Sequence, residues 1–181
     1  MHPTPSQTVG PFYGYALPFP GGADVAPSGH PGAVTVHGNV LDGSGAPVPD
    51  ALLEFWQDAP EGASGSMRRD PASGGFLGRD GVTFTGFARV ATDAAGHFAL
   101  RTLPPARTPY LAVVVFARGL LHHLHTRVYL PHLPGAEDDP LLARLPPDRR
   151  ATLLAVPERD GVFRFDVHLQ GSHETVFLAF D

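Results

Sequence analysis

Short apolar segments with a period of two, separated by turns rich in glycine and proline, recur along most of this sequence. In residues 161–171, "GVFRFDVHLQG", phenylalanine, valine and leucine alternate with arginine, aspartate and histidine, as in a strand with one buried face. Segments of the same kind are 33–42, 51–58, 84–93, 96–103, 110–119, 125–131 and 175–181. Eight or nine short strands predict an all-β fold, an antiparallel β-sandwich.

Three parts of the chain depart from this pattern. Residues 1–33 are rich in proline and glycine, so we expect an extended N-terminal arm that precedes a sandwich domain at 34–181. Residues 58–82 form a long glycine-rich loop. The segment 138–156 predicts one short helix, which Asp148 would cap because two preceding prolines prevent an earlier start.

One of the predicted strands differs from the others in its pattern. Residues 110–119 are apolar at nearly every position, which predicts a strand buried on both faces.

Composition excludes several classes of function. With 181 residues, a net charge of −5 and no lysine, the chain predicts one main domain without a basic surface for nucleic acid. We expect no membrane partner and a cytoplasmic location, because the sequence lacks a long apolar run and an apolar leader. The absence of cysteine excludes disulfides and thiolate metal sites, so a metal would need His, Tyr, Asp or Glu ligands.

Two features are candidates for a functional site. His122, His123 and His125 lie within four positions, and on a strand His123 and His125 would share one face. They could be two ligands of a metal site, or partly buried imidazoles that pair with backbone groups beside Arg127. Arg118 ends an apolar strand, where a guanidinium is either an exposed cap or a donor directed into a cleft.

Six segments, taken in order, resemble the intradiol ring-cleaving dioxygenases, and they span most of the chain. They are "TPSQTVGPFY" at 4–13, "LEFWQ" at 53–57, "FARVATDAAGHFALRTL" at 87–103, "FARG" at 116–119 with "HLHTRVYLP" at 123–131, "RFDVHLQG" at 164–171 and "ETVFLAFD" at 174–181. The first segment and the fourth are similar in particular to the α chains of two-chain members. The resemblance implies a β-sandwich enzyme that opens the ring of protocatechuate between its hydroxyls with O₂.

The resemblance also implies where the metal lies. Such enzymes hold Fe(III) through two tyrosines and two histidines of the β chain, and phenolate oxygens suit a ferric ion. Residues 58–109 of this chain contain no tyrosine, and Tyr110 and Ala112 occupy the positions of the two histidines. We therefore expect no metal site in this chain and Fe(III) in a partner β subunit. The histidines at 122–125 match no ligand position of the family.

An α chain of this kind implies a site shared with its partner. Thr8, Gly10 and Pro11 match the arm segment that lines the substrate channel, and Arg118 matches an arginine that reaches toward the shared pocket and its small aromatic substrate. Simple docking of the arm, and an interface ion pair of Arg118 without a catalytic part, are the competing interpretations. Two other functions stay open: a self-sufficient metalloenzyme that uses the histidines, and a transthyretin-like sandwich that binds a small molecule or protein without catalysis.

Overall fold

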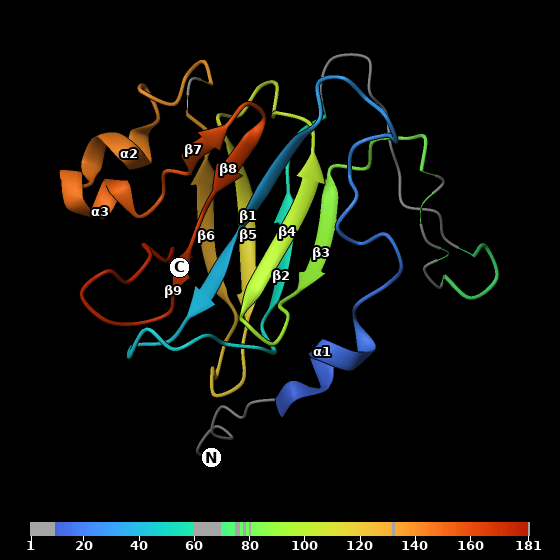
Figure 1. Ribbon diagram of the computed structural model, residues 1–181, viewed down its shortest axis with the longest axis horizontal. Helices are drawn as coiled ribbons and strands as arrows, with labels where there is room; N and C mark the ends of the chain where they lie inside the picture. The colour runs from blue at the N-terminus through green and yellow to red at the C-terminus, as the bar shows by residue number, and fades with distance from the viewer. Residues whose placement is uncertain are drawn as a thin grey trace.

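Two β-sheets packed face to face form the body of the computed structural model, which describes residues 10–59, 70–74, 77, 79, 81–131 and 133–180 (Figure 1). One sheet has five strands in the order β4-β1-β8-β7, with β9 also paired to β1, and the other has the order β3-β2-β5-β6. The strands are β1 Val34–Leu41, β2 Leu52–Trp56, β3 Phe87–Ala91, β4 His97–Thr102, β5 Tyr110–Phe116, β6 Leu124–Tyr129, β7 Val156–Arg159, β8 Val162–Arg164 and β9 Val167–His168.

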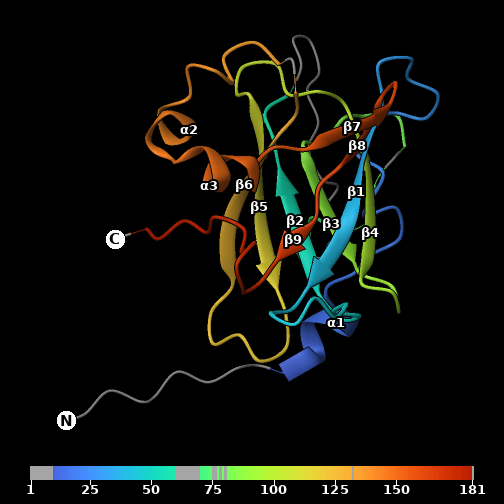
Figure 2. The ribbon, with the colours of Figure 1, turned by 60° about the vertical axis from the view of Figure 1, so that its left-hand side comes forward.

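The core lies between the sheets and consists of the inward residues of the alternating pattern. Phe55 of β2 and Phe98 of β4 face each other across the layers, with ring centroids 5.8 Å apart. Val36 and Val113 lie beside them and are fully shielded from solvent. In β5 only alternate residues are buried and the others are half-covered, so the predicted burial on both faces is wrong. Figure 2 shows the two layers, with α1 at one end of them.

The five-stranded sheet is mixed and not purely antiparallel, because β8 and β9 both run parallel to β1. They are two pieces of the single strand predicted at 161–171. A Cβ placed on Gly38 would lie 1.9 Å from the carbonyl oxygen of Phe165, so the two backbones cross in contact there. The Asn39 N–H donates to the Asp166 carboxylate at 2.9 Å. The Asp166 carboxylate thus takes the place of a backbone carbonyl as the acceptor for Asn39, and the pairing with β1 is interrupted between β8 and β9.

The closing segment differs from the predicted strand at 175–181. Within its described part, the Leu178 N–H donates to the His125 carbonyl at 2.8 Å, in an isolated bridge. The Thr126 hydroxyl donates to the Val176 carbonyl at 2.7 Å. This segment therefore runs along the edge of β6 without extending the sheet.

The strand β7 was not predicted from the sequence. Its four residues are all exposed, so they lack the alternation of apolar and polar residues that indicates a strand with one buried face.

The described residues form short helices in two places: two in the arm, where none was predicted, and two within 138–156, where one was predicted. They are η1 Gly10–Phe12, α1 Tyr13–Ala16, α2 Pro140–Arg144 and α3 Pro147–Ala151. Asp139 caps α2 by accepting from the Leu141 N–H at 2.8 Å, whereas Asp148 lies in the first turn of α3 and is not its cap. Leu145 before Pro146 is extended, as proline requires of its predecessor, and this separates the two helices.

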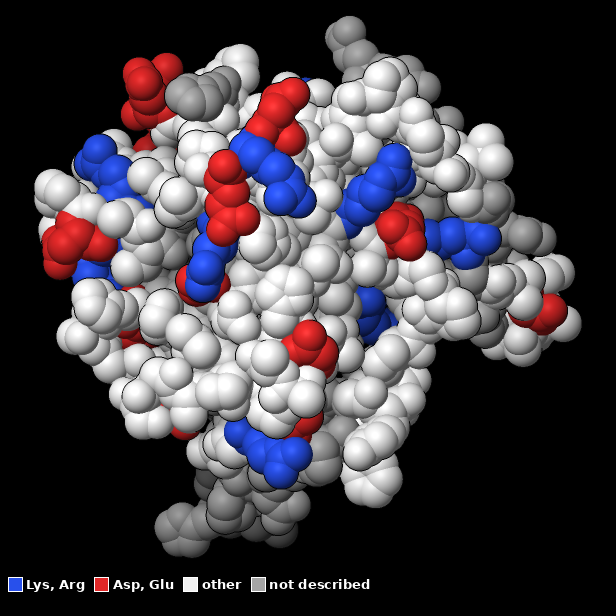
Figure 3. Space-filling model, in the orientation of Figure 1, with Lys and Arg blue, Asp and Glu red and all other residues white. Residues whose placement is uncertain are grey.

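The described part of the arm packs against the sandwich. The Val25 N–H donates to the Arg101 carbonyl at 2.7 Å, and the Arg101 N–H donates to the Ala23 carbonyl at 2.8 Å. Val25 and Ala26 are buried in the core. On the face shown in Figure 3, acidic and basic side chains are interspersed, and ion pairs such as Arg164–Asp166, 3.0 Å apart, occur within the five-stranded sheet.

Candidate functional site

Arg118 lies at the end of β5, where the strand leaves the sandwich. Its Nε donates to Oδ2 of Asp50, which lies in the turn two residues before β2. The Arg118 side chain is 65% exposed, whereas that of Asp50 is 18% exposed. The carboxylate is therefore the fixed partner of the pair, and the guanidinium reaches outward from it.

Tyr13 of α1 packs beside this pair. Its ring lies 6.1 Å from that of Phe116, the last residue of β5, and its side chain is buried. Burial, reinforced by the nearby Asp50 carboxylate and opposed by Arg118, raises the pKa of Tyr13 to about 12. Within the described ranges, the Tyr13 hydroxyl and Oδ1 of Asp50 are buried without a hydrogen-bond partner. Both residues belong to the site by geometry; Tyr13 ends the family-like segment 4–13 without a role predicted for it, and no sequence motif contains Asp50.

The predicted arm residues that the structure describes lie just before Tyr13 in the chain. Gly10 and Pro11 form the start of η1, directly before α1, and Gly10 has a φ of 67° with open space around its Cα. The helix α1 thus lies at the end of the sandwich where β5 ends (Figure 2), and its Tyr13 ring contacts Phe116, the last residue of β5. Thr8 lies outside the described residues, as does most of the loop 58–82.

The histidine cluster is a row of aromatic contacts. His123 and His125 share one face, as predicted, with ring centroids 4.8 Å apart. The row continues to Phe116 beside His123, at 5.5 Å, and to Phe180 beside His125, at 5.0 Å. Burial, together with His123, lowers the pKa of His125. These rings therefore form a continuous row along β6 and its neighbours.

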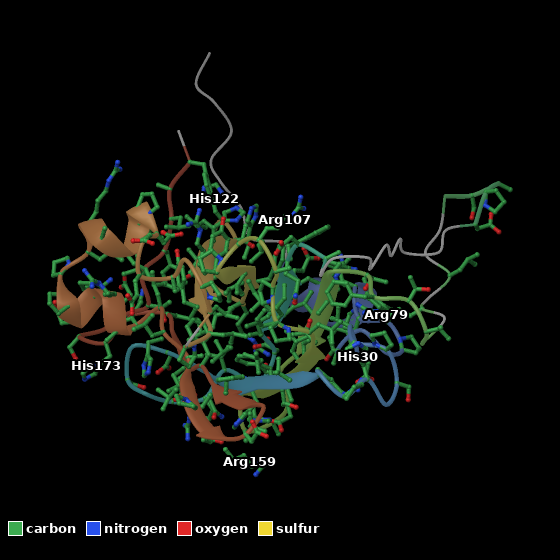
Figure 4. All side chains as sticks on the ribbon, turned by 90° about the horizontal axis from the view of Figure 1, so that it is seen from above. His30, Arg79, Arg107, His122, Arg159 and His173 are labelled. Atoms are coloured by element: carbon green, nitrogen blue, oxygen red, sulfur yellow. The ribbon has the colours of Figure 1, made fainter. Side chains whose placement is uncertain are left out.

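Three other histidines, His30, His122 and His173, lie well apart from one another (Figure 4). Within the described part of the chain, no group of three or more His, Cys, Asp or Glu side chains is arranged to hold a metal ion. The described residues therefore supply no ligand set for the metalloenzyme that uses the histidines.

Arg127 of β6 occupies the neighbourhood of the two positions that the resemblance assigns to iron ligands. Its guanidinium carbon lies 3.9 Å from the ring centroid of Tyr110, and in the ladder it pairs with Ala112. It also donates to the Tyr129 hydroxyl at 3.2 Å and lies 3.5 Å from the Asp139 carboxylate. Burial outweighs the opposing effect of Arg127 and raises the pKa of the Tyr129 hydroxyl to about 12.

The start of the loop after β2 is fixed by two polar residues. Gln57 donates to the Leu103 carbonyl at 2.7 Å and accepts from the Thr102 hydroxyl at 2.6 Å. Asp58 accepts from the Arg107 N–H at 2.6 Å and from the Thr108 hydroxyl at 2.9 Å. Burial alone would raise the pKa of Asp58, but these hydrogen bonds outweigh it and lower that pKa. The loop therefore starts from a rigid base.

Comparison with known proteins assigns this architecture to a family. The dioxygenase family model, Dioxygenase_C, matches residues 11–131. A protocatechuate 3,4-dioxygenase alpha chain from Burkholderia cepacia is 42% identical, in an alignment that covers 97% of this chain and 96% of the relative. The chain belongs to the intradiol dioxygenase family. The corresponding alpha chain from Pseudomonas putida is 35% identical over 98% of this chain and 96% of its own length.

Solved structures of intradiol dioxygenases share the fold. The dioxygenase domain of a carbohydrate-binding fusion protein from Streptomyces sp. SirexAA-E is 27% identical, with a TM-score of 0.58, over 83% of this chain and 88% of that one. Catechol 1,2-dioxygenase from Acinetobacter sp. ADP1, at 20% identity and a TM-score of 0.55 over 80% of this chain and 55% of that one, shows the fold alone. These findings support the intradiol interpretation and not the transthyretin-like alternative.

Enzymes of the intradiol family generally use Fe(III), so the residues of this chain must be tested against that ion. Ala112 has no donor atom, and the ring of Tyr110 is covered by a cation that would repel a metal ion. The described residues at these positions do not fit iron. The helices of the described ranges have at most five residues, and none could cross a membrane.

Proposed function

We propose that this chain is the iron-free α subunit of a protocatechuate 3,4-dioxygenase. Together with a β subunit that holds Fe(III), it would form the enzyme that cleaves protocatechuate between its hydroxyls with O₂. Both oxygen atoms enter the product, 3-carboxy-cis,cis-muconate. The observation that carries the proposal is the 42% identity to an α chain over 97% of this chain. The cation at Arg127, against the would-be ligand positions, supports it.

In this proposal the end of the sandwich around Arg118 faces the β subunit. The substrate is a catecholate that carries a carboxylate, so an arginine, charged at every working pH, favours its binding. Thr8, Gly10 and Pro11 would line the channel, where glycine permits close approach of the backbone and proline needs no hydrogen-bond partner. The contribution of this chain is therefore to bind and orient the substrate, and to exclude water from a site whose metal belongs to the partner.

The proposal includes the remaining organisation of the enzyme. Residues 1–33 would act as the docking arm and residues 34–181 as the sandwich domain, and αβ units would associate into a hetero-oligomer. A cytoplasmic location is part of the proposal, because a chain without cysteine gains nothing from an oxidising compartment.

Reconstitution tests the proposed function. The chain is expressed alone, and also together with a β chain that carries the two-tyrosine, two-histidine set. Oxygen uptake with protocatechuate is then measured for both preparations. The proposal predicts copurification of the two chains and turnover only in the pair. Turnover by the chain alone, or failure of every such β chain to copurify with it, would refute the proposal.

A further inference from the structure

Three side chains from separate segments meet at the Arg118 end of the sandwich, and only Arg118 carries a predicted role. From this meeting we propose that Asp50 is a positioning residue for Arg118 and that Tyr13 couples the arm helix to the pair. Together they would present the outer end of the guanidinium to a carboxylate in the pocket shared with β. The inference builds on the proposed function and assigns roles to two residues that it leaves unassigned.

The first step is the asymmetry of the ion pair. Asp50 is largely covered and Arg118 is largely exposed, and an ion pair with such an exposed partner adds little to folding stability. A free arginine side chain loses much rotamer freedom when it binds an anion, and anchoring it in advance reduces that loss. The pair is therefore better explained as a device that orients Arg118 than as one that stabilises the fold.

The second step is which donors the anchor leaves available. A guanidinium has five N–H donors in one plane. Asp50 accepts from Nε, and no other hydrogen bond of Arg118 is found among the described residues. Both Nη groups of Arg118 therefore remain available as donors. Two Nη groups side by side match the two oxygens of a carboxylate in a bidentate pair.

The third step links Arg118 to the arm. The Tyr13 hydroxyl and Oδ1 of Asp50 are both buried and lack a partner among the described residues, and leaving such groups unpaired is costly. One is a donor and the other an acceptor, and the Asp50 carboxylate lies near enough to Tyr13 to raise the pKa of its hydroxyl, although burial contributes more. The helix α1 also packs on this residue, since a Cβ at Gly14 would lie 4.0 Å from the Asp50 carbonyl oxygen. Movement of the arm is thereby transmitted to Asp50 and to Arg118.

The carboxylate could come from the substrate or from an acidic side chain of β, and steady-state kinetics of the αβ enzyme separate these sources. With Asp50→Asn, KM for protocatechuate should rise about 10-fold, the value of one charge-assisted hydrogen bond, with kcat within about twofold. KM for catechol, which lacks a carboxylate, should stay unchanged if the source is the substrate. If the source is β, the affinity of α for β should fall about 10-fold instead. Either result supports the positioning role.

Matched variants make the test specific. Tyr13→Phe should act on the same quantity as Asp50→Asn: it should raise KM for protocatechuate, or weaken the affinity of α for β, by about threefold. Asp50→Glu, which keeps the carboxylate, should lose less of that substrate or β affinity than Asp50→Asn. Asp166→Asn is the control, because Asp166 also accepts from an arginine Nε, that of Arg164, but on the five-stranded sheet. Melting temperatures of all variants identify any that fail to fold, and Tyr13→Phe keeps the test valid if Asp50→Asn is one of them.

The outcomes are distinguishable from those of the proposed function. If the wild-type pair turns over protocatechuate while Asp50→Asn and Tyr13→Phe behave like Asp166→Asn in both KM and β affinity, the positioning role is wrong and the proposed function stands. If the wild-type pair itself shows no turnover, the proposed function has failed first.

Discussion

The guanidinium carbon of Arg127 lies 3.9 Å from the centre of the Tyr110 ring, on the side of the sheet where the iron ligands of a catalytic relative are expected. Tyr129 and Asp139 complete its surroundings with a hydroxyl at 3.2 Å and a carboxylate at 3.5 Å. The guanidinium of Arg127, which is always charged, thus contacts the face of the Tyr110 ring, the Tyr129 hydroxyl and the Asp139 carboxylate. The Arg127 cation thus occupies the space beside Tyr110 and Ala112 that a metal ion bound at these positions would need.

Removal of the Arg127 cation should destabilise the chain. Arg127→Met leaves the Asp139 carboxylate, 7% exposed, with the Leu141 N–H but without its cationic partner. A fully buried pair costs 3–5 kcal/mol when broken, and the partial exposure of Arg127 reduces this to about 2 kcal/mol. Urea denaturation of both proteins measures the difference. Arg164→Met, which breaks a more exposed pair, should cost less than about 0.5 kcal/mol, and an equal loss in both variants would contradict the structural role of Arg127.

Acid should remove the contribution of Asp58. Its pKa in the folded chain is below the ordinary value of 3.8, so its stabilising effect is fully present above pH 3.8 and is lost as the pH falls through the folded value. Asp58→Asn should cost about 1 kcal/mol at pH 7, because the acceptor of the Arg107 N–H and the Thr108 hydroxyl is weakened. The difference between wild type and variant should shrink below pH 4. A difference that stays constant down to pH 3 would show that the carboxylate charge is not involved.

Mild acid should act through His125. Its folded pKa is below the ordinary value of 6.5 because of burial and of His123. Above pH 6.5 the ring is neutral in both states, and below it the unfolded chain binds the proton more readily, so stability falls. His125→Phe should therefore flatten the decline of unfolding free energy between pH 7 and pH 5. The same slope in wild type and His125→Phe would refute this assignment.

The crossing of β1 with the segment between β8 and β9 should not tolerate a side chain at Gly38. A methyl group there would overlap the Phe165 carbonyl oxygen at 1.9 Å, so Gly38→Ala should cost at least about 3 kcal/mol or prevent folding. Gly32→Ala is the matched control, because its nearest neighbour is a side-chain atom of His30 at 3.4 Å. Thermal melting compares the two variants. A normal melting temperature for Gly38→Ala would mean that the backbones do not cross in contact.

Sequence patterns predicted most strands correctly, because period-two alternation reports directly on which face of a strand is buried. The segments at 33–42, 51–58, 84–93 and 96–103 contain β1 to β4 as expected. The pattern could not reveal the interruption at Phe165, since it depends on contact with Gly38, which is far away in the chain. Two helices formed where one was expected, because Pro147 starts a helix of its own.

The candidate site was only partly predictable for the same reason. Arg118 is recognisable as a charge at the end of an apolar strand. The roles of Asp50 and Tyr13 depend on the meeting of a turn, an arm helix and a strand end, and no local pattern encodes such a meeting. The sequence identifies Arg127 only as a neighbour of the histidines, because its contacts with Tyr110 and Asp139 form only in the folded sheet.

The iron content of the purified single chain tests the central claim most directly. Metal analysis should find no iron above background in this chain alone, which should also be colourless, and about one iron per αβ pair after coexpression with β. Stoichiometric iron in the chain alone, lost when Tyr110 is replaced by phenylalanine, would contradict the assignment of the metal to the partner subunit.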